Sequence, residues 1–168
     1  MRVAVGSDHA GFALKEVLKA ELTERGHEVD DLGTANGEAS VDYPDYGAAV
    51  GRAVVSGRAE LGVCTCGTGI GIAMAANKIP GVRAAVIHDA TTATLAREHN
   101  QANVICLGGR VLSRAVALDA LASFLSATEQ HGRHDVRIAK LADLDLGLEP
   151  GLDPGLEPAL DLEGIPSS

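Results

Sequence analysis

Aromatic side chains are scarce in this sequence of 168 residues, which has two phenylalanines, two tyrosines and no tryptophan. Proteins that bind single-stranded nucleic acid stack bases on aromatic rings, so this composition argues against such a function. The core must be built from Ala, Val, Leu and Ile, which the hydrophobic content of 46% can supply. At this length a single globular domain with one substantial core is the expectation.

Cysteines are also few, and the three present, Cys64, Cys66 and Cys106, cannot all form pairs. The sequence begins directly with what reads as a strand, so no signal peptide is expected and a reducing, cytoplasmic location is predicted. Long apolar runs are missing as well. The longest uncharged stretch, 61–77, is rich in glycine and marginal in length for a membrane span, so no membrane segment is predicted.

Basic residues are absent from one part of the chain. Residues 143–168 contain seven acids and no base, so subtracting them from the net charge of −9 leaves about −2 for residues 1–142. The acidic part includes three copies of a Gly-Leu-acid-Pro repeat, and a proline at every fourth residue excludes a continuous helix. We expect a folded domain over 1–142 and a solvated acidic tail over 143–168, although its regular leucines leave open packing on a neighbouring surface. Nucleic-acid binding is not supported.

Short apolar runs alternate with longer segments of helical period, which is the pattern of βαβ units. Strands are predicted at Val3–Gly6, His27–Asp31, Leu61–Cys64, Ala84–Ile87 and Asn103–Cys106. Helices are predicted at Phe12–Arg25, Tyr46–Ser56, Ile72–Asn77, Thr91–Glu98 and Ser113–Ala127. Right-handed crossovers then give a Rossmann-like three-layer α/β/α sandwich with a five-stranded parallel sheet. Its ligand crevice should lie beyond the carboxyl ends of the strands.

The strongest chemical signal is a thiol, Cys66, placed directly before the glycine-rich stretch 67–71. Glycines leave backbone N–H groups uncovered, so the loop can surround an anion, and the same donors favour the ionised form of the thiol. Cys66 is therefore a candidate base or nucleophile, with a buried apolar role as the alternative. Cys64 and Cys106 fit strand interiors and are predicted to belong to the core.

Two familiar site types do not fit this loop. It lacks the Lys-Ser/Thr of a P-loop and the spacing of the Gly-x-Gly-x-x-Gly fingerprint, so an anion smaller than a nucleotide suits it better. The Cys-x-Cys pair lacks a partner pair or a spaced histidine pair, so no metal site is predicted.

Other polar residues are ambiguous when taken singly. Asp8 and His9 follow the first strand, where their side chains either contact a ligand or are satisfied by hydrogen bonds within the loop. His99 and Asn100 end the fourth predicted helix, where capping is an equally good explanation. Arg133 and Arg137 are four residues apart, so on a helix both share one face; they can hold a phosphate or simply face solvent.

Taken together, the motifs resemble the ribose-5-phosphate isomerase type B and galactose-6-phosphate isomerase family. The resemblance spans 1–142, in family order, and leaves out the acidic tail. It is carried by Gly6–Phe12, Asp42–Pro44, Cys66–Gly71, Ala75–Lys78, Arg83–Ala85, His99–Asn103 and Gly132–His134.

The resemblance implies an aldose–ketose isomerase of the pentose phosphate pathway, without metal or organic cofactor, acting on ribose 5-phosphate and ribulose 5-phosphate. By that likeness Cys66 moves the proton between C2 and C1 through a cis-enediolate, Thr68 relays protons, and His99 opens the sugar ring. The implied substrate-binding residues are Asp8, His9, Gly67, Thr68, Gly69, Ile70, Gly71, Asn100, Arg110, Arg133 and Arg137. A homodimer, or a dimer of dimers, with active sites shared between subunits is also implied.

Some family members carry glycine at the thiol position and a glutamate shortly after the glycine loop. This sequence has Cys66 and Ile72 at those places, which assigns it to the cysteine-using branch. Three alternatives stay open. They are an isomerase of another sugar phosphate (galactose or allose 6-phosphate, or a tetrulose 4-phosphate), a non-catalytic sugar-phosphate-binding protein, and a redox switch through Cys64 and Cys66.

Overall fold

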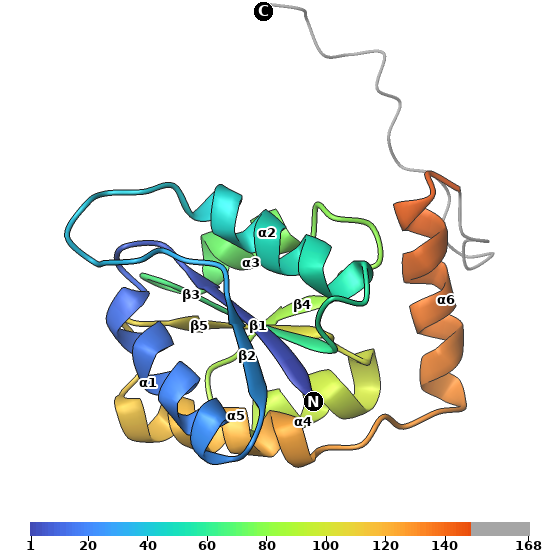
Figure 1. Ribbon diagram of the computed structural model, residues 1–168. Helices are drawn as coiled ribbons and strands as arrows, with labels where there is room; N and C mark the ends of the chain where they lie inside the picture. The colour runs from blue at the N-terminus through green and yellow to red at the C-terminus, as the bar shows by residue number, and fades with distance from the viewer. Residues whose placement is uncertain (149–168) are drawn as a thin grey trace, which may run out of the picture.

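The computed structural model describes residues 1–148, which form a three-layer α/β/α sandwich around a five-stranded parallel sheet (Figure 1). The strand order is β2-β1-β3-β5-β4. The strands are β1 (Arg2–Ser7), β2 (Glu28–Asp31), β3 (Leu61–Cys66), β4 (Ala84–Val86) and β5 (Val104–Gly108). The predicted fold class is confirmed. β3, however, runs to Cys66 rather than ending at Cys64, so the thiol of Cys66 closes the strand instead of following it.

The helices cover the two faces of the sheet unequally. On one face lie α1 (Phe12–Glu24), α4 (Ala90–Asn100) and α5 (Arg114–Ser126), and on the other lie α2 (Tyr43–Val55) and α3 (Ile70–Ala76) (Figure 1). Alternate residues of each strand enter opposite cores, as Val3 and Val5 pack with α1 and α5 while Ala4 packs with α2 and α3. Strands covered on both faces are therefore almost continuously apolar.

A sixth helix, α6 (Arg133–Asp145), stands at the side of the sandwich (Figure 1). It is not among the predicted helices, although the spacing of Arg133 and Arg137 places both on one face of any helix there, and it extends past the predicted domain boundary at residue 142. Its C-terminal end is attached by Asp145, whose carboxylate accepts the Gly81 N–H at 2.7 Å. The rest of the predicted acidic tail, 149–168, lies outside the described residues. None of the helices within 1–148 is both long and apolar enough to cross a membrane.

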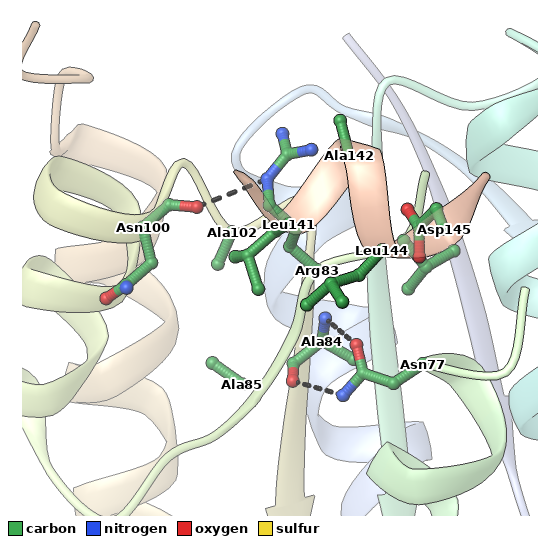
Figure 2. Close-up of a pocket in the computed structure, with 11 residues that line it drawn as sticks. Asn77, Arg83, Ala84, Ala85, Asn100, Ala102, Leu141, Ala142, Leu144 and Asp145 are labelled. Atoms are coloured by element: carbon green, nitrogen blue, oxygen red, sulfur yellow. Dashed lines mark hydrogen bonds between the residues drawn. The ribbon is translucent and has the colours of Figure 1, made fainter. Parts of the chain in front are cut away.

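The edge strand β4 has an unusual partner. The side-chain amide of Asn77 donates to the Ala84 carbonyl at 2.8 Å and accepts the Ala84 N–H at 2.7 Å (Figure 2). The amide thus takes both hydrogen bonds that a further strand would make with this residue. A cavity of about 450 Å³ lies between this edge and α6, lined in part by Arg83, Asn100 and Leu141.

A buried lysine holds the chain that leads from β2 towards α2. The Lys15 ammonium group donates to Asp31 and to the Thr34 carbonyl, both at 2.8 Å, and its side chain is only 2% exposed. Burial alone would raise the pKa of Asp31, but hydrogen bonds from Lys15 and Lys19 outweigh it and lower this pKa. The carboxylate therefore stays charged and anchors the segment that supplies Val41 and Tyr43 to the sheet's carboxyl edge.

We expect Lys15→Met to reduce the free energy of unfolding by about 2–3 kcal/mol, because it leaves a buried carbonyl and a carboxylate oxygen without their donor. Urea denaturation measures this loss. Lys19→Met is the matched control: it removes another ammonium group from Asp31, but from a side chain that is 31% exposed. Its cost should stay below about 1 kcal/mol. Equal costs for the two variants would contradict a structural role for the buried ammonium group.

Candidate active site

The carboxyl ends of three neighbouring strands bring the first group of polar residues together. Ser7 is in register with Thr65, and Cys66 with Gly108, so the loops after β1, β3 and β5 begin side by side. Backbone hydrogen bonds join these loops, from Gly109 N–H to the Cys66 carbonyl at 2.8 Å and from Arg110 N–H to the Gly67 carbonyl at 2.9 Å. Asp8, Cys66 and Arg110 therefore share one edge, as the sequence predicted.

The thiol of Cys66 faces the glycine loop. Its Sγ accepts a hydrogen bond from the Gly69 N–H at 3.1 Å, and the residue is only 4% exposed. Gly69 has φ of +81°, and a Cβ there would lie 3.1 Å from the backbone of Leu107. Only glycine permits this turn without strain, and the turn points the amide at the sulfur.

The other two thiols belong to the core. Cys64 and Cys106 are register partners on β3 and β5, and both are fully buried. Burial, together with the neighbouring Cys64 thiol, raises the pKa of Cys106 well above its ordinary value. A thiol kept protonated in an apolar layer is a poor nucleophile, which agrees with the prediction that these cysteines are structural.

Two polar residues after β1 flank the thiol loop. Asp8 is 7% exposed, and its Oδ1 accepts the Gly11 N–H at 2.9 Å. The Nδ1 atom of His9 lies 3.2 Å from both the backbone nitrogen and the carbonyl oxygen of Val41. It accepts from the Val41 N–H in one tautomer and donates to the Val41 carbonyl in the other, and either contact holds the ring beside the segment before α2.

The glycine loop itself is bordered by three further side chains. Thr68 is exposed, and its hydroxyl oxygen accepts the Ile70 N–H at 3.3 Å. The Arg110 side chain runs beside Gly67, with Cδ 3.5 Å from the position of a Cβ there. The ring of Tyr43 covers Gly71, and its Cζ atom lies 2.8 Å from the position that a Cβ of residue 71 would take. No role for Tyr43 was predicted from the sequence. Its place in the Asp42–Pro44 motif of the family is the feature that could have indicated one.

A second group of predicted residues lies at the opposite end of the sheet. The ring of His99, near the end of α4, stacks on that of His134 in α6, with centroids 4.4 Å apart and planes 9° from parallel. Asn100 follows His99, and its backbone carbonyl accepts from Arg83 Nε at 3.2 Å (Figure 2). Arg133 and Arg137 are exposed, and neither forms an ion pair with a carboxylate of residues 1–148.

The connection between α5 and α6 fixes this second group. Gln130 N–H donates to the Glu98 carbonyl at 2.9 Å, and Arg97 pairs with Glu129 at 2.9 Å. The first turn of α6 is thereby attached to the last turn of α4. Two guanidinium groups and two imidazoles gather there, which is a composition suited to a phosphate dianion and to proton exchange with sugar hydroxyls.

The two groups do not meet within one chain. β5 runs from Val104 at one end to Gly108 at the other, a length of roughly 13 Å at about 3.3 Å per residue. Cys66 lies at the carboxyl end and His99 at the amino end of the strands. The two groups of predicted residues therefore lie at opposite ends of the sheet in one chain.

Comparisons with known proteins identify the family to which the chain belongs. A family model described as Ribose/Galactose Isomerase matches residues 3–141. Ribose-5-phosphate isomerase B of Escherichia coli is 41% identical over 144 residues, covering 86% of this chain and 96% of that protein. The enzyme of the same name from Mycobacterium tuberculosis is 40% identical over 146 residues, covering 86% and 90%.

Solved structures show the same likeness. Ribose-5-phosphate isomerase B from Clostridium thermocellum has a TM-score of 0.86 and 46% identity, over 88% of this chain and 99% of that one. The enzyme from Mycoplasma genitalium, solved with bound ribulose-5-phosphate, has a TM-score of 0.82 and 38% identity, over 86% and 96%. The protein is thus an isomerase with a Rossmann-like α/β fold. It belongs to the Ribose/Galactose Isomerase family.

We expect Gly69→Ala to slow alkylation of Cys66 by iodoacetamide about tenfold. A Cβ at this φ of +81° strains the turn and moves the amide away from the Cys66 sulfur. Losing a hydrogen bond to the reacting thiolate costs about 1.5 kcal/mol or more. Mass spectrometry of the peptide that contains Cys66 measures the rate. Gly26→Ala is the matched control, since its φ is +80° but nothing lies within 4 Å of the new Cβ. Both variants should lose about 1–2 kcal/mol of stability. Unchanged alkylation in Gly69→Ala would mean that the Gly69 amide does not activate the thiol.

Proposed function

We propose that the protein interconverts ribose 5-phosphate and ribulose 5-phosphate, with Cys66 as the base. The observation that carries this proposal is the Gly69 N–H directed at the Cys66 sulfur, beside Asp8 and His9. The names of the relatives point to the same substrate pair, and one of the similar structures was solved with ribulose-5-phosphate bound.

In the proposed reaction the sugar ring opens first, because the C2 proton of the aldose is acidic only beside a free carbonyl group. His99 exchanges the proton between the ring oxygen and the C1 hydroxyl. The Cys66 thiolate then removes the proton from C2 and returns it at C1. The intermediate is a cis-enediolate, and Thr68 moves a proton between its two oxygens. Amides of 67–71 lie where the oxyanion develops, and preorganised donors of this kind lower such a barrier strongly.

The remaining candidates position the substrate. We infer that Arg133 and Arg137 hold the phosphate, since they are exposed, four residues apart on α6 and without carboxylate partners among residues 1–148. Arg110 and His9 also contact the phosphate, from the group of residues that contains Cys66. Asp8 accepts hydrogen bonds from sugar hydroxyls, and Asn100 contacts the chain between phosphate and carbonyl. Within the glycine loop Gly67 and Gly71 contribute backbone N–H groups, while the Gly69 N–H binds the Cys66 sulfur and the Ile70 N–H binds the Thr68 hydroxyl oxygen.

The proposed site needs a second copy of the chain. A symmetric dimer can place the His99 group of one protomer against the Cys66 group of its partner, and symmetry then completes both sites at once. Apolar side chains left exposed on two elements support such an interface. They are Ile70 and Met74 of α3, at 49% and 63% exposure, and Val136 and Leu144 of α6, at 63% and 57%. Exposed apolar groups in this number favour association.

Wild-type protein should convert ribose 5-phosphate to the ketose, and Cys66→Ala should lower kcat by about a thousandfold, within the usual contribution of a positioned base. Ketose formation is followed directly. Cys64→Ala is the matched control, because it removes a buried thiol two residues away and should stay within about threefold of wild type. Full activity in Cys66→Ala would refute the base. Faster turnover of a six-carbon or four-carbon sugar phosphate would refute ribose 5-phosphate as the preferred substrate.

Mixing two inactive variants tests the shared site. Cys66→Ala and His99→Ala each disable one half, so a heterodimer carries one intact site and one doubly defective site. Unfolding and refolding an equal mixture should restore about a quarter of wild-type activity, because half of the dimers are mixed and each has one good site of two. Each variant refolded alone should stay inactive. No recovery in a mixture that forms dimers would refute a site that combines Cys66 of one protomer with His99 of its partner.

A further inference from the structure

His134 is a buried polar residue in the second group of residues, which also contains His99, Arg133 and Arg137. It is 5% exposed, although it belongs to the first turn of a helix whose other residues are mostly exposed. Its ring lies flat against His99 at 4.4 Å, with only 9° between the planes. Two imidazoles in this arrangement restrict each other's rotation, so the plane of His99 is set by His134.

A hydrogen bond continues from this stack to the phosphate-binding residues. Arg133 Nε donates to His134 Nε2 at 3.3 Å, so Nε2 is the acceptor and the proton of the neutral ring is on Nδ1. The contact uses Nε of the guanidinium group and leaves its outer nitrogens for an anion. Arg133, His134 and His99 therefore form one continuous chain of contacts.

The surroundings keep His134 uncharged. Burial is the main cause that lowers its pKa, and the positive charges of His99, Arg133 and Arg137 lower it further. Asp135 acts in the opposite sense, but its carboxylate is occupied by the Gly132 N–H, His131 and Gln101. A neutral ring beside His99 leaves His99 free to carry the exchangeable proton, whereas two stacked imidazolium ions would repel each other.

We propose that His134 is a positioning residue that contacts both the phosphate-binding Arg133 and the ring-opening His99 and orients both side chains toward one substrate molecule. This role rests on the proposed function. It assigns two separable effects to one side chain. The stacked ring orients His99 for the ring-opening step, and the Nε2 acceptor orients Arg133 for the phosphate.

Two substitutions separate these effects. His134→Phe keeps an aromatic ring against His99 but removes the acceptor for Arg133. His134→Gln keeps an acceptor near the position of Nε2 but removes the ring. His27→Gln, at a histidine between α1 and β2, is the matched control. Thermal unfolding and size-exclusion chromatography of the full-length variants confirm that each is folded and associated like wild type.

Two assays separate ring opening from proton transfer. Turnover of ribose 5-phosphate begins from the closed ring and needs both steps. Exchange of deuterium from solvent into C1 of ribulose 5-phosphate needs proton transfer alone, because the phosphate on O5 prevents this ketose from closing a five-membered ring. A residue that merely maintains the fold would affect both assays equally.

His134→Gln should lower kcat for ribose 5-phosphate about tenfold, because small misplacements of a catalytic group cost factors of this size. At saturating ribulose 5-phosphate its C1 exchange should stay within about twofold of wild type. His134→Phe should raise KM about fivefold, with kcat and saturated exchange nearly unchanged. Parallel losses in both assays, or wild-type kinetics in both variants, would overturn the positioning role.

His99→Ala, measured in the same two assays, distinguishes this inference from the function on which it rests. It should nearly abolish ring-dependent turnover and leave C1 exchange in place. If His99→Ala behaves in this way while His134→Gln behaves like wild type, only the role of His134 fails. Unchanged turnover of ribose 5-phosphate by His99→Ala would refute the ring-opening assignment, and the role of His134 with it.

Discussion

A helix that joins two parallel strands must run antiparallel to them, and this constraint governs the whole arrangement of functional groups. Residues in the loops after the strands, such as Asp8 and Cys66, collect at the carboxyl edge. Residues at the end of a crossover helix, such as His99, are returned to the amino edge. A chain that needs both sets in one site cannot unite them by local rearrangement. Association of two copies is the simplest geometric solution.

Much of this architecture could be predicted from the sequence, because parallel strands covered on both faces and glycine-rich turns leave local signals. The strand pattern, the glycine loop after Cys66 and the core positions of Cys64 and Cys106 all follow from such signals. The details that escaped prediction depend on contacts between distant segments. Tyr43 covers Gly71 only because α2 and α3 lie together. α6 continues past residue 142 although, within residues 1–148, α4 is the only other helix that it contacts substantially.

The same distinction explains why no role was predicted for His134, although it belongs to one of the family motifs. A histidine between two arginines on an amphipathic helix reads as part of a solvated face. Its burial arises from the Gln130–Glu98 and Arg97–Glu129 contacts, which draw the start of α6 onto the end of α4. Lys15 is the converse case, a charged residue in an amphipathic helix whose burial depends on a carbonyl nineteen positions away.

The amide of Asn77 on β4 has a consequence for how copies of the chain can associate. An open edge of a parallel sheet invites pairing with another chain, which can extend without limit and lead to aggregation. At Ala84 both outward-facing backbone groups are already occupied by Asn77. The sheet therefore cannot grow across this point, so copies of the chain that met at this side would have to do so through helices. Assemblies formed through helices can close symmetrically at a small number of subunits.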